Sequence, residues 1–123
     1  MTRILFRTAE HEFTADFDDL PASKKLIAHL PIASFVSTWG DEIYFDTGIE
    51  APADGATMDV STGDVAYWPA GKSLCIFFGR TPASKDDRPV PASPVVVVGR
   101  TGADPDELRA IPANQEIIVS LAQ

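Results

Sequence analysis

Two short apolar runs in the middle of the chain, Val65–Trp68 and Leu74–Phe78, most constrain how it can fold. Both are rich in aromatic and branched residues, as strands are, and both are too short to be confident helices. Between them lies Pro69-Ala70-Gly71-Lys72, and a proline followed two residues later by a glycine free to take a positive φ predicts a chain reversal. The sequence therefore predicts two neighbouring antiparallel strands, largely buried, at the centre of a β protein.

Similar strand patterns occur along the rest of the chain. Apolar residues alternate with polar ones in Glu12–Phe17, which predicts one buried and one exposed face. The β-branched run Val95–Gly99 indicates a strand buried on both faces. Further strands are predicted at Arg3–Arg7, Ile32–Trp39, Glu42–Phe45, Thr57–Val60 and Glu116–Leu121.

Two short helices complete the predicted elements. The first spans Ser23–Leu30 after two capping acids, Asp18 and Asp19, and Pro21 suits its first turn. Its apolar stripe must pack on the sheet. The second runs from Pro105 to about Ala110, with Asp104 as N-cap and Glu107 placed for a capping box. With no repeat or linker, residues 1–123 are expected to form one domain. The predicted fold is mainly β, a closed barrel of about eight strands with helices capping its ends.

Composition excludes several classes of partner. The chain of 123 residues carries a net charge of −8, which disfavours nucleic acid and anionic membrane surfaces. Its single cysteine, Cys75, rules out an internal disulfide, and no apolar run reaches membrane-spanning length. The start of the chain shows no leader pattern, so a cytoplasmic protein is expected. His11 and His29 stand on different elements, so no metal site is predicted. No Walker loop, GxSxG, CxxC or HExxH motif occurs, and no cofactor is predicted.

The candidate site is a group of aromatic and charged residues near the central strands. Buried tryptophan and tyrosine need partners for their polar atoms, so they often line pocket rims, although a packed core is the alternative. Adjacent acids in a strand point to opposite faces, so Asp41 and Glu42 would not share a metal, but one of them could orient a ligand beside Trp39 and Tyr44. Lys72 and Arg80 flank the central strands and could receive an anionic group, although solvated strand ends are the alternative. The candidate ligand-binding residues are Trp39, Asp41, Glu42, Tyr44, Tyr67, Trp68, Phe77, Phe78 and Arg80.

The element order and several motifs resemble the cyclophilin barrel. Trp39–Phe45 (WGDEIYF), Gly63–Pro69 (GDVAYWP) and Phe78–Pro82 (FGRTP) look like signatures of a small cyclophilin-like family of bacteria and archaea. The resemblance covers nearly the whole chain and implies a cyclophilin-like fold. For members of this family it implies no assigned biochemical role.

The residues that cyclophilins use for prolyl isomerisation are missing at the corresponding positions. A catalyst of this reaction needs an apolar proline pocket and a charged donor to the twisting amide. The stretch Ser34–Phe45, which corresponds to the cyclophilin strand with the donor arginine, holds no arginine, histidine or glutamine. The pocket histidine and tryptophan of cyclophilins are also absent from Lys85–Pro94. These departures argue against ordinary isomerase activity.

Three functions remain open from the sequence. The favoured one is a binding module for a small molecule or short peptide, with the Pro-rich segment Thr81–Pro94 as a binding or lid loop. The second is an atypical prolyl isomerase that takes its donor from Arg80, Arg88 or Arg100. The third is an assembly protein that forms a homodimer through exposed aromatics or an edge strand.

Overall fold

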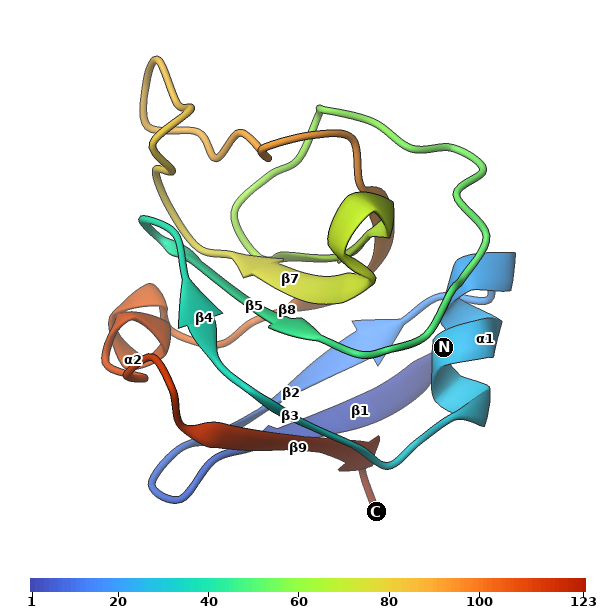
Figure 1. Ribbon diagram of the computed structural model, residues 1–123. Coiled ribbons are helices and arrows are strands. Elements are labelled where there is room, and N and C mark those ends of the chain that lie inside the picture. Colours follow the sequence, from blue (N-terminus) through green and yellow to red (C-terminus); the bar gives the residue numbers. More distant parts are fainter.

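The computed structural model describes all residues, 1–123, and shows a nearly closed antiparallel barrel with two short helices (Figure 1). No helix is long and apolar enough to cross a membrane. In chain order the elements are β1 (Thr2–Arg7), β2 (Glu12–Phe17), α1 (Pro21–Ala28), β3 (Ile32–Phe35), β4 (Ser37–Thr38), β5 (Glu42–Asp46), β6 (Asp64–Trp68), a turn of 3-10 helix (Pro69–Gly71), β7 (Ser73–Phe77), β8 (Val96–Thr101), α2 (Pro105–Arg109) and β9 (Glu116–Leu121).

A single sheet of nine strands forms the barrel in the order β3-β9-β1-β2-β8-β6-β7-β5-β4. The two edge strands, β3 and β4, are consecutive in the chain and only Val36 separates them. The sheet therefore curls until its first and last strands meet at this residue. The predicted fold class is confirmed, with nine strands where about eight were expected, because the predicted strand Ile32–Trp39 is divided at Val36.

The central strand pair is confirmed. β6 and β7 are antiparallel neighbours, with Val65 opposite Ile76 and Trp68 opposite Ser73. The reversal between them differs in one detail from the prediction, because Lys72 takes the positive φ of 49° and Gly71 does not. The 3-10 turn extends through Gly71, so the left-handed residue falls one position later.

Two other predicted segments differ from the structure. Thr57–Val60 forms no strand, and only Thr57 makes an isolated bridge, to Val95. The first helix begins at Pro21, which was predicted for its first turn, and ends at Ala28, two residues before the predicted end. The Asp18 carboxylate still serves the helix start by accepting hydrogen bonds from the Leu20 N–H and the Ser23 hydroxyl. At α2, Asp104 accepts from the N–H of residue 106 as an N-cap should.

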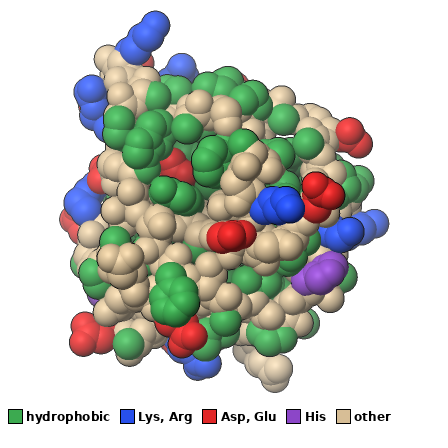
Figure 2. All heavy atoms as spheres, viewed as in Figure 1, with side chains coloured by type: hydrophobic (Ala, Val, Ile, Leu, Met, Phe, Trp, Pro, Cys, Tyr) green, Lys and Arg blue, Asp and Glu red, His purple; other side chains and the backbone are tan.

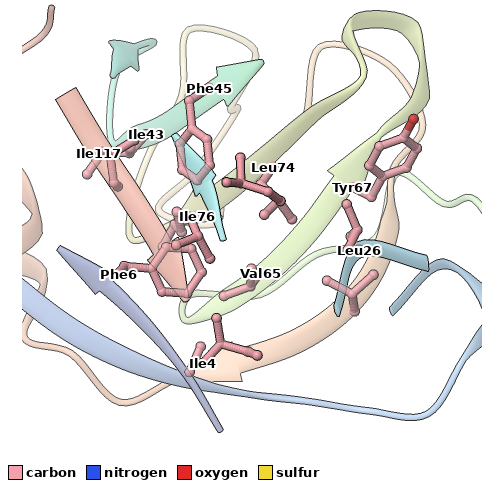
Figure 3. Packing of buried hydrophobic residues seen from close by; sticks show 14 of the residues in the cluster. Ile4, Phe6, Leu26, Ile43, Phe45, Val65, Tyr67, Leu74, Ile76 and Ile117 are labelled. Carbon is pink, nitrogen blue, oxygen red and sulfur yellow. The ribbon is translucent and has the colours of Figure 1, made fainter. Parts of the chain in front are cut away.

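Two separate apolar clusters lie on opposite faces of the same strands. The larger fills the barrel and includes Phe6, Val65, Leu74 and Ile76 (Figure 3). The smaller cluster consists of Val60, Ala66, Cys75, Phe77 and Val95. Because neighbours along a strand alternate between faces, this second cluster lies outside the barrel, where the loops 47–63 and 78–95 cover β6 and β7. Figure 2 shows hydrophobic side chains gathered over this upper part of the molecule.

Hydrogen bonds hold the two covering loops to each other and to the barrel. The backbone groups of Thr57 and Val95 exchange hydrogen bonds of 2.8 and 2.9 Å. The Thr81 hydroxyl donates to the Val90 carbonyl oxygen at 2.6 Å and so closes the second loop on itself. The long loops are therefore fixed walls over the outer face of the barrel.

Candidate functional site

A mainly apolar cavity of about 190 Å³ lies between the outer face of the barrel and the loop 78–95. Six of its eight lining residues are hydrophobic, which matches the usual ligand site of apolar walls with few polar groups. A larger hollow between the ends of β1 and β9 has only two hydrophobic residues among seven. The cavity is lined by Trp39, Glu42, Tyr44, Trp68, Cys75, Pro91, Ala92 and Val95.

The register of the β5–β7 pair determines which side chains form the floor of the cavity. In the β5–β7 pair, Tyr44 lies opposite Cys75, and Glu42 lies opposite Phe77. Residues that face each other across an antiparallel pair share a face of the sheet. All four side chains therefore project outward, away from the barrel core.

The two tryptophans of the chain form the aromatic walls. Trp39 begins the tight turn before β5, where its N–H donates to the Glu42 carbonyl oxygen at 3.0 Å. The Trp68 ring meets the Tyr44 ring edge-on, with centroids 6.2 Å apart and planes at 85°. Its indole N–H donates to the Ser93 hydroxyl oxygen at 2.5 Å, which ties this wall to the long loop.

The turn that positions Trp39 depends on Gly40. Its φ of +60° lies in the left-handed region, and a Cβ there would come within 2.8 Å of the Arg80 carbonyl oxygen. A residue with a side chain would therefore strain the turn and push the following loop away. Glycine at this position lets the turn hold Trp39 and Glu42 at the same cavity.

Glu42 is the polar centre of the cavity. The residue is only 6% exposed, and none of the five ion pairs in the structure includes it. Burial raises the pKa of its carboxyl from the ordinary 4.5 to about 7, and a hydrogen bond with the Cys75 thiol opposes part of this rise. Burial, and next the Glu42 charge, also raises the pKa of the Cys75 thiol, so this sulfur is a poor nucleophile at neutral pH.

Asp41, by contrast, points away from the cavity. The Arg109 guanidinium donates to both oxygens of its carboxylate, at 3.1 and 2.9 Å, and thereby links α2 to the start of β5. This contact also raises the pKa of Arg109. The two adjacent acids occupy opposite sides of the strand, as the strand geometry predicts.

The other four candidate residues also lie outside the cavity lining. Tyr67 is buried inside the barrel, and its hydroxyl points away from the core cluster, donating to one loop backbone carbonyl at 2.7 Å and accepting from one N–H at 3.1 Å (Figure 3). Phe77 packs in the outer cluster, and Phe78 packs in the main core. Arg80 is exposed, with its guanidinium 3.9 Å from the Asp87 carboxylate.

Four of the nine candidate residues, Trp39, Glu42, Tyr44 and Trp68, therefore share one cavity. Sequence reasoning missed four other lining residues, Cys75, Pro91, Ala92 and Val95. The signal for Pro91 and Ala92 was the Pro-rich segment itself, which was interpreted as a binding loop without naming its contact residues. Val95 was assigned only to the strand that follows this segment. For Cys75 the signal would have been the strand register, which the sequence does not give.

No arginine lines the cavity. Arg100 donates to the Asp64 carboxylate at 2.6 Å and to the Thr62 carbonyl oxygen at 3.1 Å. Arg88 lines a different hollow, formed with residues 58–60. The charged donor to the substrate amide, which an isomerase requires, is therefore not beside this apolar cavity.

Comparisons with known proteins agree on the family. A family model described as cyclophilin-like matches residues 2–120. The solution structure of the hypothetical protein AF2241 from Archaeoglobus fulgidus is similar to this chain, with 33% identity and a TM-score of 0.83, over 98% of this chain and 95% of that chain. A search of curated proteins gave no significant match.

A more distant likeness concerns the fold alone. The structure of McbB in complex with tryptophan has 17% identity and a TM-score of 0.66, over 96% of this chain and 44% of that chain. The family match over almost the whole length and the nine-stranded barrel lead to one conclusion: this chain belongs to the cyclophilin-like family.

Proposed function

We propose that this protein is a binding module that takes a small molecule, or one side chain of a short peptide, into the aromatic cavity. One observation carries the proposal: both tryptophans and Tyr44 converge on a buried carboxyl in a single cavity. An apolar cavity of roughly 150 Å³ is large enough to bind benzene. The cavity of about 190 Å³ therefore suits a ligand of that size or slightly larger.

The same geometry favours binding over ordinary prolyl isomerisation. Isomerisation has a barrier of roughly 18–20 kcal/mol, and a catalyst lowers it by donating a hydrogen bond as the amide twists. The ionisable groups at this cavity are a carboxyl, a thiol and a phenol, and none of them is a permanent cation. The atypical isomerase is therefore the weaker alternative.

Binding is tested by a fragment screen read out by the intrinsic fluorescence of Trp39 and Trp68, since the chain has no other tryptophan. Ala92 is an exposed lining residue, so Ala92→Phe should fill the cavity without disturbing the core. Ala53→Phe, at an exposed position of the other long loop, is the matched control. Fragments should lose binding in Ala92→Phe and keep it in the control. A screen without ligands, or ligands indifferent to Ala92→Phe, would contradict the proposal.

The isomerase alternative is tested separately with a protease-coupled cis/trans assay and a genuine cyclophilin as positive control. We expect no acceleration at high protein concentration. Acceleration that disappears in Arg80→Ala, Arg88→Ala or Arg100→Ala would instead support the enzyme and identify its donor.

We also propose that the protein acts in the cytoplasm as a monomer. A single buried cysteine that cannot form an internal disulfide fits a reducing compartment. The homodimer alternative rests on β3, an end strand of the sheet, where Phe35 is 64% exposed. The monomer is favoured because the sheet curls until its two end strands adjoin at Val36. Light scattering at several protein concentrations distinguishes the two states.

A further inference from the structure

The Glu42 carboxyl is a buried polar group with no cation to balance it. It lies among three aromatic rings, and its hydrogen-bond neighbour is the Cys75 thiol, a weak donor. A carboxylate in apolar surroundings is costly unless it is paired or protonated. The fold itself supplies no cation for this carboxyl, so a positively charged group from outside is the natural complement.

The aromatic walls favour the same kind of partner. The faces of tryptophan and tyrosine rings carry partial negative charge and attract organic cations. The cavity is surrounded by Trp39 from the turn before β5, Tyr44 from β5 and Trp68 from β6. Its other side is closed by the apolar surface of Pro91, Ala92 and Val95. The net charge of −8 further repels anionic ligands. Three independent features, the carboxyl, the rings and the overall charge, therefore select for positive charge.

We propose that the ligand of this cavity is a small organic cation, with its ammonium group beside Glu42 and its alkyl groups against the rings of Trp39, Tyr44 and Trp68. This inference rests on the proposed binding function and specifies its ligand class. The ammonium group belongs either to a free small molecule or to a lysine side chain of a short peptide. Both sources offer the same chemistry to the cavity.

The test compares choline with dimethylbutanol, the neutral alcohol in which carbon replaces the choline nitrogen. The two probes have nearly the same shape, so a difference in affinity reports the charge. At about pH 8, where most of the Glu42 carboxyl is ionised, choline should bind at least about tenfold more tightly. Binding is followed by tryptophan fluorescence and confirmed by calorimetry. A third arm uses a short peptide, capped at both ends, that contains trimethyl-lysine, and tighter binding of this peptide than of choline would assign a peptide source.

Glu42→Gln removes the charge and preserves the shape of the side chain. In this variant, choline should lose about tenfold in affinity, while dimethylbutanol should change by less than about twofold. Glu116→Gln removes an exposed charge on β9 and controls for the overall charge of the protein. It should leave both affinities unchanged. The binding of dimethylbutanol to Glu42→Gln also shows that the variant is folded.

Each other outcome overturns a defined part of the argument. Equal affinity for choline and dimethylbutanol would refute the cation inference and leave the binding module standing. A preference for choline that survives in Glu42→Gln would refute the placement of the ammonium group beside Glu42. Absence of binding by all three probes would refute the cation inference, and failure of the wider fragment screen as well would refute the binding module.

Discussion

Replacing Glu42 by glutamine should change how the stability of this protein depends on pH. Burial raises the pKa of this carboxyl in the folded protein from the ordinary 4.5 to about 7. Between these two values the folded protein binds more protons at this site than the unfolded chain does. The free energy of unfolding therefore falls as pH rises through this range, and the loss is complete above about pH 7.

The magnitude follows from the size of the pKa difference. Each pKa unit corresponds to about 1.4 kcal/mol, so the Glu42 carboxyl lowers the free energy of unfolding by about 3 kcal/mol at neutral and higher pH. Glutamine has the same shape and does not ionise. Relative to the wild-type protein, the Glu42→Gln variant should therefore gain about 3 kcal/mol of stability between about pH 4 and about pH 8.

The assay is urea unfolding at several pH values, followed by tryptophan fluorescence in the wild-type protein and the variant. Subtracting the two free energies removes the contribution of all other titrating groups. Glu116→Gln, at an exposed position, should show a difference close to zero at every pH. A Glu42→Gln difference that does not vary with pH would refute the reasoning, because the carboxyl would then be equally solvated in both states. The organic-cation inference would lose part of its physical basis with it.

Three further outcomes follow from the structure. Tyr67→Phe should lower the free energy of unfolding by about 1–3 kcal/mol, because two loop backbone groups lose their buried partner; an unchanged urea midpoint would contradict this. Gly79→Ala should cost about 1–3 kcal/mol, since its Cβ would lie 2.3 Å from an Asp41 carboxylate oxygen; full stability would show that Asp41 moves freely. The Cys75 thiol should react slowly with a thiol reagent in the folded protein and rapidly in urea, and fast reaction without urea would show an open cavity floor.

The fold could be predicted from local patterns because these elements are determined by residues within or next to them. The antiparallel pairing of β6 and β7 followed from their short connection, and the bounds of β9 followed from the alternation in Glu116–Leu121. The start of α2 followed from Asp104 and the proline after it. The division at Val36 was not visible, because it reflects closure of the sheet and not a break in the apolar pattern.

The site could be predicted only in part because the central strands are buried on both faces. Alternation assigns Tyr67 and Trp68 to opposite faces of β6, but with both faces apolar it does not say which one lies inside the barrel. Tyr67 proves to be the core residue and Trp68 the cavity residue. The placement of Cys75 beside Glu42 depends on the β5–β7 register, and the pairing of Asp41 with Arg109 depends on where α2 docks. Both contacts depend on the tertiary structure, which no local sequence pattern specifies.

The packing of the outer cluster leaves a cavity beside Glu42. The loops 47–63 and 78–95 bury Ala66, Cys75 and Phe77 against the barrel as an ordinary second core would. At the edge of that core, however, the packing leaves a cavity, and the residue at its floor is an acid. An apolar residue at this position would avoid the stability loss that ionisation of Glu42 brings. Because no cation within the fold pairs with Glu42, a bound cation would offset this cost, and this is the reason to seek the function at this cavity.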